Sequence, residues 1–168
     1  MLRKRICVIT DNKYIYEKFK EIKDKYPHDF VFYYSAHNNK FIDEYANDID
    51  FSPISLKSRD ETFYQQFDLF ISLHCKQLFP KNLVDNHNCI NVHPGFNPYN
   101  RGWFPQVFSI INGKPIGVTI HKMDEELDHG AIIAQKKLEI EPWETSLDIY
   151  RRILQAEIDL FGDFRRKS

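Results

Sequence analysis

Short apolar runs alternate with polar, partly helical segments along the first half of the chain. Residues 5–10 form an apolar run that ends in turn formers, and Ile15, Phe19, Ile22 and Tyr26 then recur at helical spacing. Further strands are predicted at residues 30–34, 49–54, 68–73 and 89–93. This alternation of strands and helices predicts an α/β fold with a parallel sheet and flanking helices.

The second half of the chain continues the pattern and carries all six glycines. Strands are predicted at 116–123 and 131–140, and a helix is predicted at 104–112, where Pro105 suits the first turn. At helical spacing, Phe104 and Phe108 are expected to be core residues. A last helix is predicted to begin at Thr145, in a capping box that has Asp148 in place of the usual Glu.

The loop after the first strand bears on the class of ligand. It reads Thr10-Asp11-Asn12 and contains no glycine. A dinucleotide fingerprint or a P-loop needs glycines at this point, because they let the backbone approach phosphates closely. The sequence therefore disfavours dehydrogenases and NTPases.

Composition favours one packed domain over residues 1–168. The chain has 42% apolar and 28% charged residues, a formal net charge of −1, and no apolar run long enough to cross a bilayer. We therefore expect neither bulk nucleic-acid binding nor membrane insertion. The three cysteines are odd in number and far apart in the sequence, which favours a reducing, cytoplasmic location.

Asn91 and His93 are the first candidates for chemistry. They lie two apart on a predicted strand, so both side chains project from one face at the C-terminal edge of the sheet. A carboxamide that stabilises an oxyanion and an imidazole that titrates near neutrality suit acyl transfer to an amine. Periodicity alone favours a simpler role for both residues, as strand-end polar groups that hydrogen-bond to the loop.

The surrounding motifs extend this interpretation. Asn91-Val92-His93-Pro94 is followed by Arg101-Gly102, by Gly117-Val118-Thr119-Ile120-His121 and by Leu127-Asp128-His129-Gly130. This order of motifs resembles the folate-dependent formyltransferases, most clearly over residues 68–135. The resemblance implies a Rossmann-like formyltransferase fold with a mostly parallel, twisted sheet of about seven strands, and 10-formyltetrahydrofolate as the formyl donor.

Within that family, the stretches 74–80 and 93–103 look most like the nucleotide-sugar N-formyltransferases, whose usual acceptor is a dTDP-linked amino-dideoxy sugar such as dTDP-4-amino-4,6-dideoxyglucose. The glycine-poor loop after the first strand disfavours the purine-pathway relative. The chain length and the charge balance disfavour the tRNA-dependent relative. The resemblance also implies a role in building bacterial surface polysaccharides such as the O-antigen.

Residue roles follow from the resemblance. It implies that Asn91 holds the formyl oxygen, that His93 assists deprotonation of the sugar amine, and that Asp128 orients His93 and assists proton transfer to the departing nitrogen. Charge patterning alone would make Asp128 part of a solvated acidic turn. The predicted substrate-binding residues are Lys76, Gln77, Tyr99, Trp103, Asp11 and Asn12. The predicted folate-binding residues are Leu78, Phe79, Pro80, Asp124, Leu127 and Gly130.

Simpler roles remain for several of these residues. Lys76 could be a solvated lysine, and Asp11 and Asn12 could cap the first helix. No pair of histidines has convincing metal-ligand spacing, so no metal is expected. The sequence stops soon after the last helix, so we expect it to lack the family's C-terminal dimerisation segment, which leaves a homodimer open.

The sequence leaves one alternative function open and disfavours another. The chain could be a truncated formyltransferase-like module that binds nucleotide sugar or folate without turnover. A flavodoxin-like receiver is disfavoured, because Asp11 alone stands where a receiver gathers several acidic residues.

Overall fold

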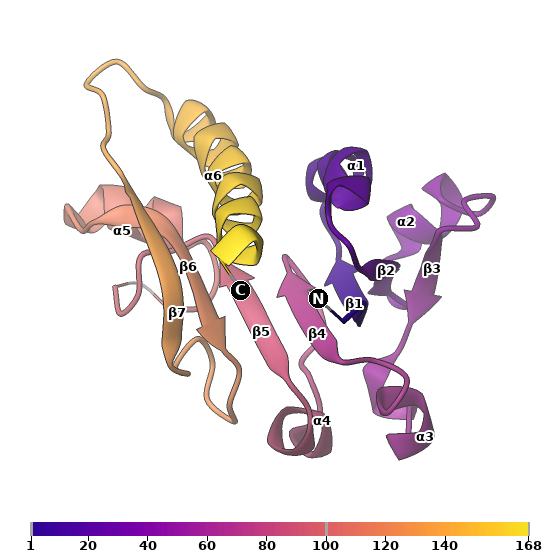
Figure 1. Cartoon of the computed structure of the whole chain (residues 1–168). Coiled ribbons are helices and arrows are strands. Elements are labelled where there is room, and N and C mark those ends of the chain that lie inside the picture. The colour runs from indigo at the N-terminus through magenta and orange to yellow at the C-terminus, as the bar shows by residue number, and fades with distance from the viewer. Residues whose placement is uncertain (1, 100, 168) are drawn as a thin grey trace. The chain divides into compact units, whose positions relative to one another are not determined.

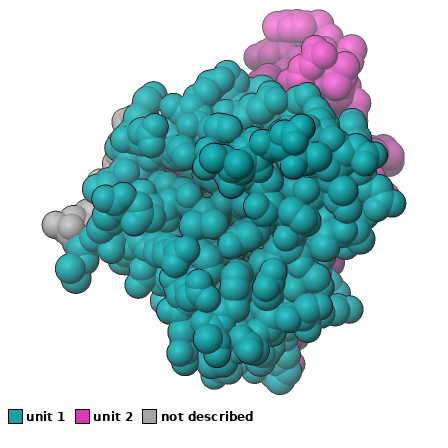
Figure 2. All heavy atoms as spheres, turned by 90° about the vertical axis from the view of Figure 1, so that its right-hand side faces the viewer, with its two compact units in different colours: residues 1–90 teal, residues 91–168 magenta. Residues whose placement is uncertain are grey.

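A computed structural model describes residues 2–99 and 101–167, the last five of them by their backbone only. The chain divides into two compact units, residues 1–90 and 91–168, which are coloured separately in Figure 2. Strand β5, Cys89–His93, begins in the first unit and ends in the second.

Unit 1 is built on a parallel sheet (Figure 1). Its strands follow the order β3-β2-β1-β4, continued by the start of β5. Every pairing among β1 to β4 is parallel. The bounds of the elements are Arg5–Thr10 (β1), Lys13–Ile22 (α1), Asp29–Ser35 (β2), Asn39–Glu44 (α2), Phe51–Ile54 (β3), Glu61–Tyr64 (α3), Leu69–Leu73 (β4) and Lys81–Asn86 (α4).

The core of unit 1 is rich in aromatic rings. Five consecutive residues of β1 are buried, as expected for a central strand that is covered on both faces. Tyr16 of α1 stacks on Phe51 of β3 with ring centroids 3.8 Å apart, and Phe19 packs edge-on against Phe32. These contacts hold α1 against the sheet.

Unit 2 contains the end of β5, then β6 and β7, in that order across the sheet. β6 and β7 form an antiparallel pair whose register shifts between Ile120 and His121. The last helix, α6, packs on both of these strands (Figure 1). The bounds are Pro105–Asn112 (α5), Ile116–Lys122 (β6), Ile132–Leu138 (β7) and Ser146–Lys167 (α6).

The predicted α/β class is confirmed, with seven strands, most of them parallel. The capping box at the start of α6 is also confirmed. The amide and the hydroxyl of Thr145 both donate to Asp148 Oδ2, and the Asp148 amide donates back to Thr145 Oγ1 at 3.2 Å. Among the helices that the structure describes, none is both long enough and apolar enough to span a membrane.

The prediction that Phe104 and Phe108 are core residues is wrong. Phe104 is 62% exposed and Phe108 is 50% exposed, whereas the polar Gln106 and Ser109 face the interior. Helical spacing shows that residues share a face, but it does not show which face of α5 finds a packing partner.

Candidate active site

Asn91 and His93 project from one face of β5 at its C-terminal end. His93 is only 3% exposed, and Asn91 is half-buried. Both belong to unit 2, so the predicted pair lies within one compact body.

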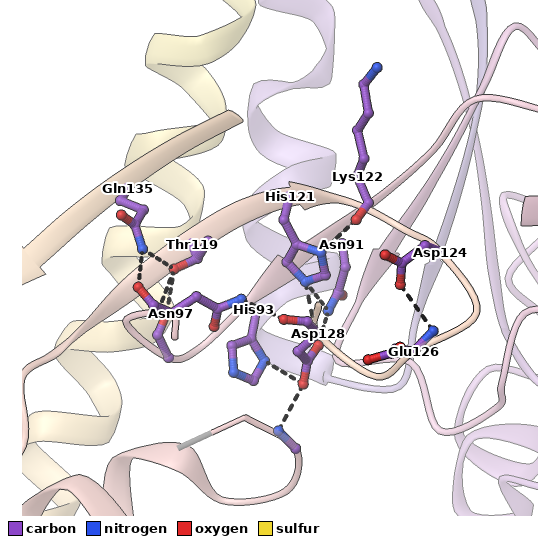
Figure 3. A network of polar contacts seen from close by, with 12 residues as sticks. Asn91, His93, Asn97, Thr119, His121, Lys122, Asp124, Glu126, Asp128 and Gln135 are labelled. Atoms are coloured by element: carbon purple, nitrogen blue, oxygen red, sulfur yellow. Dashed lines mark hydrogen bonds and ion pairs between the residues drawn. The ribbon is translucent and has the colours of Figure 1, made fainter. Parts of the chain in front are cut away.

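Asp128 lies beside this pair, in the turn between β6 and β7 (Figure 3). Its Oδ1 accepts a hydrogen bond from Asn91 Nδ2 at 2.9 Å, and its Oδ2 accepts one from the Gly102 amide at 2.8 Å. His93 Nδ1 lies 3.4 Å from Oδ2, and His121 Nε2 lies 3.4 Å from Oδ1. The structure therefore brings Asn91, His93 and Asp128 together and adds His121 to them.

The surroundings of Asp128 favour its ionised form. Burial by itself raises the pKa of this carboxyl, because a low-dielectric interior disfavours charge. The hydrogen bond with His121, the positive charge of a protonated His93 and the Gly102 amide outweigh burial, and the net pKa is below its ordinary value. The site thus holds a buried carboxylate against two imidazoles at neutral pH.

His121 lies against both Asn91 and Asp128. The Nδ1 atom of His121 lies 2.7 Å from the Lys122 carbonyl oxygen, which only accepts, so this nitrogen carries a hydrogen. Its Nε2 lies 3.2 Å from Asn91 Nδ2 and 3.4 Å from Asp128 Oδ1. His121 therefore contacts both Asn91 and the carboxylate to which Asn91 donates.

Glycine is required beside His93. A Cβ atom on Gly95 would lie 2.5 Å from His93 Nε2 and 3.0 Å from Pro105 Cβ. The backbone therefore passes so close to the imidazole that it restricts where the ring can lie.

Three predicted folate-binding residues, Asp124, Leu127 and Gly130, belong to the turn that carries Asp128. Asp124 accepts from the Glu126 amide at 3.0 Å, and its Oδ2 lies 3.1 Å from His129 Nδ1. That contact with His129 is the main reason why the pKa of Asp124 is lowered. Leu127 is 57% exposed.

The same turn requires a glycine at Gly130, because a Cβ there would lie 1.8 Å from the Lys122 carbonyl oxygen.

The other three predicted folate-binding residues lie in unit 1, just before α4. Leu78 is exposed, and Phe79 and Pro80 are half-buried. Folate binding by all six residues stays a prediction.

Asp11 ties together the strand ends of unit 1. It accepts from the Ser35 amide and the Asn38 side chain at Oδ1, at 3.0 and 2.9 Å, and from the Ser35 hydroxyl and the Lys76 amide at Oδ2, at 2.5 and 2.7 Å. Asn12 caps α1, where its Oδ1 accepts from the Ile15 amide at 3.1 Å.

Gln77 is also held by the fold. Its Nε2 donates to the Ile54 carbonyl and the Ser35 hydroxyl, and its Oε1 accepts from the Leu56 amide at 2.8 Å. The Lys76 side chain is exposed. In unit 2, Tyr99 and Trp103 are 41% and 69% exposed. Substrate binding by these residues stays a prediction.

Sequence reasoning gave several groups of this site no role. His121 and Gly102 stand in motifs that carry the resemblance, but neither is given a role there, and Asn97 and Gln135 are given none either. The alternation of side chains along a strand could have indicated His121, because residues 119 and 121 lie on one face of β6. Nothing in the local sequence marks Asn97 or Gln135.

The arrangement suits proton transfer and the stabilisation of an oxyanion. A buried imidazole that is oriented by a carboxylate can accept a proton, and a neighbouring carboxamide can donate to a developing oxyanion. Among residues 2–99 and 101–167, no cluster of His, Cys, Asp and Glu side chains could hold a metal ion.

Comparison with known proteins points to the same chemistry. A family model described as formyl transferase matches residues 4–163. The chain is 58% identical over 96 residues to the dTDP-4-amino-4,6-dideoxyglucose formyltransferase of Mycobacterium tuberculosis (strain ATCC 25618 / H37Rv), a match that covers 57% of this chain and 41% of that protein.

Two solved structures have the same fold. A 4-N formyltransferase from Francisella tularensis is 44% identical, with a TM-score of 0.88 over 95% of this chain and 66% of that one. The formyltransferase PseJ from Anoxybacillus kamchatkensis, solved with UDP-4,6-dideoxy-4-formamido-L-AltNAc and tetrahydrofolate, is 22% identical, with a TM-score of 0.72 over 95% and 74% of the two chains.

The match spans less than half the length of the curated Mycobacterium relative. The family model, by contrast, covers nearly all of the present chain and includes the whole cluster around Asp128. The chain belongs to the formyl transferase family.

Proposed function

We propose that this chain transfers a formyl group from 10-formyltetrahydrofolate to the amine of a dTDP-linked amino-dideoxy sugar, such as dTDP-4-amino-4,6-dideoxyglucose. The contact of the buried Asp128 with Asn91, beside the buried His93, is the observation that carries the proposal. The 58% identity to a relative of that name supports the choice of acceptor.

The residues of unit 2 fit this reaction. The sugar amine must be neutral to attack the formyl carbon, and His93 is placed to take up the proton that the amine loses. Asp128 orients the His93 ring through Nδ1 and stabilises it when it is protonated. A new carbon–nitrogen bond forms to the sugar, the bond to the folate nitrogen breaks, and the proton passes to that nitrogen.

Asn91 is placed to stabilise the negative charge that develops on the formyl oxygen. Its Nδ2 donates to Asp128 Oδ1 at 2.9 Å and lies 3.2 Å from His121 Nε2. An amide nitrogen carries two hydrogens, and the bond to Asp128 Oδ1 uses one of them. We infer that Asn91 donates the other hydrogen to the formyl oxygen.

The remaining assignments rest on the same proposal. Nucleotide sugar and folate are the proposed partners, and the cytoplasm is the proposed location, which suits the three free cysteines. Binding of either ligand without turnover is the alternative function.

A formyl-transfer assay tests the proposal. The protein is mixed with 10-formyltetrahydrofolate and a panel of dTDP-amino-dideoxy sugars that differ in the position and the configuration of the amine, and N-formyl product is detected by mass. We expect product with at least one sugar, and a loss of about 100-fold or more in Asn91→Ala, His93→Ala and Asp128→Asn.

Two comparisons complete this experiment. His37→Ala, an exposed histidine of unit 1, is the matched control and should retain the wild-type rate. Saturable binding of a ligand by folded wild-type protein, without product from any sugar, would replace the enzyme proposal with the binding module.

A further inference from the structure

A buried series of hydrogen bonds connects β7 to the turn that carries Asp128. It starts at Gln135, whose Nε2 donates to the Asn97 carbonyl at 2.8 Å and to Thr119 Oγ1 at 3.0 Å (Figure 3). Gln135 lies in the middle of β7, and the two groups that accept from its Nε2 belong to Asn97 and Thr119. The series of bonds from Gln135 toward Asp128 therefore runs through these two residues.

Thr119 is the first of these partners, and its hydroxyl is fully used. It accepts from Gln135 and from the Asn97 amide at 3.1 Å, and it donates to the Gly95 carbonyl at 2.8 Å. A hydroxyl has one hydrogen and two lone pairs, so this geometry satisfies all of them. The segment 95–97, which follows His93 directly, is thereby fixed to β6 and β7.

Asn97 passes this constraint on to Asp128. Asn97 is 3% exposed, and its Nδ2 donates to the Asp128 carbonyl at 2.9 Å. The backbone of Asp128 has a φ of 53°, in the left-handed region that L residues rarely adopt. An uncommon conformation of this kind persists when its surroundings determine it, and the Asn97 bond is one such determinant.

We propose that Gln135 is a positioning residue for the proposed formyl transfer: through Thr119 and Asn97, it holds Asp128 in the conformation that aims its carboxylate at His93 and Asn91. This inference rests on the proposed function. Gln135 itself touches no reacting group, so its loss should change the rate of the chemical step and leave the binding of substrates unchanged.

The principal variant is Gln135→Met, which keeps the length of the side chain and removes both of its donor bonds. We expect kcat to fall about 10- to 100-fold, as for a catalytic group misplaced by up to about 1 Å, with KM for both substrates within about twofold of wild type. The matched control is Gln155→Met on the exposed face of α6, which should retain the wild-type kcat.

Thr119 supplies the rescue experiment. Thr119→Val removes the hydroxyl at nearly constant volume, whereas Thr119→Ser retains it. The inference requires kcat to fall in Thr119→Val and to recover in Thr119→Ser. If the hydroxyl served stability alone, the melting temperature would fall in the Val variant while kcat per folded molecule stayed constant.

A second measurement does not depend on turnover. The Gly102 amide donates to Asp128 Oδ2, so its hydrogen exchange reports whether the carboxylate is in place. We expect this amide to exchange at least about tenfold faster in Gln135→Met than in wild type.

The outcomes separate the two proposals. An inactive wild-type protein refutes the proposed function alone, and Gly102 exchange then decides the role of Gln135. Unchanged Gly102 exchange in Gln135→Met, or wild-type kcat in an active Gln135→Met, overturns the inference.

Discussion

The close approach of Gly95 to His93 leads to a quantitative prediction for Gly95→Ala. The added Cβ would lie 2.5 Å from Nε2 and 2.8 Å from Cδ2 of the imidazole, whereas ordinary contacts begin at 3.4 Å. Gly95 has no positive φ, so its backbone accepts alanine. To reach an ordinary contact distance the imidazole must therefore retreat by roughly 1 Å. Because His93 is almost fully buried in a packed interior, this movement also displaces its neighbours.

This displacement sets the magnitude of the effect. A catalytic group misplaced by about 1 Å costs on the order of 100-fold in rate. Overpacking a filled interior also costs about 1–3 kcal/mol of folding free energy, and each kcal/mol lowers the melting temperature of a chain of this size by about 2–4 °C. Gly95→Ala should therefore fold, melt earlier and turn over about 100-fold more slowly.

The assay measures kcat and the melting temperature together, with Gly113→Ala as the matched control. At Gly113 an added Cβ would meet nothing within 4 Å, but the φ of 61° makes alanine unfavourable by about 1 kcal/mol. The control should melt earlier and keep the wild-type kcat. A Gly95→Ala protein that turns over within about threefold of wild type would refute the argument from the close approach.

Two further predictions concern stability, and a third concerns a pKa. The pKa values of Asp128 and Asp48 are both lowered, because hydrogen bonds and charges outweigh burial. Their contribution to the free energy of unfolding is therefore complete above the unfolded pKa of about 4 and is lost as the pH falls below it. The urea midpoint should decline in that range, and a constant midpoint down to pH 2.5 would contradict this. Asn12→Ala removes the cap on the Ile15 amide and should cost about 1 kcal/mol, measured by urea unfolding, whereas an unchanged midpoint would show that the cap adds nothing. Tyr16→Phe removes the 2.8 Å bond to Asp48 and should raise the Asp48 pKa toward its ordinary value in an NMR titration, and a pKa equal to that in wild type would refute this.

Most of the strands could be predicted from the sequence because they are short apolar runs bounded by polar or turn-forming residues. The run at residues 5–10 corresponds to β1, whose last five residues are buried. The exposed Phe104 and Phe108 show where this reasoning fails. Apolar character predicts burial only when another element covers the same face, and the sequence of α5 does not reveal its neighbours.

For the site too, some residues could be predicted from the sequence and others could not. The spacing of Asn91 and His93 on a strand was enough to place them side by side, and the motif around Asp128 was enough to single it out among acidic neighbours. The role of the Gly102 amide could not be predicted, because a backbone donor has no sequence signature. The bond from Gln135 to Asn97 joins residues 38 positions apart, and only the register of β6 against β7 brings them together.

The contacts of Asp11 have a consequence for anions. The backbone amides of Ser35 and Lys76, which donate to its two oxygens, are the kind of group that a phosphate-binding nest offers to its ligand. The Asp11 side chain thus occupies these amides at the end of β1. Because it is attached to the chain, its effective concentration there is higher than that of a free ligand. A nucleotide phosphate that approached these amides would have to displace that carboxylate. The phosphates of a nucleotide-linked ligand would therefore need donors other than these two amides.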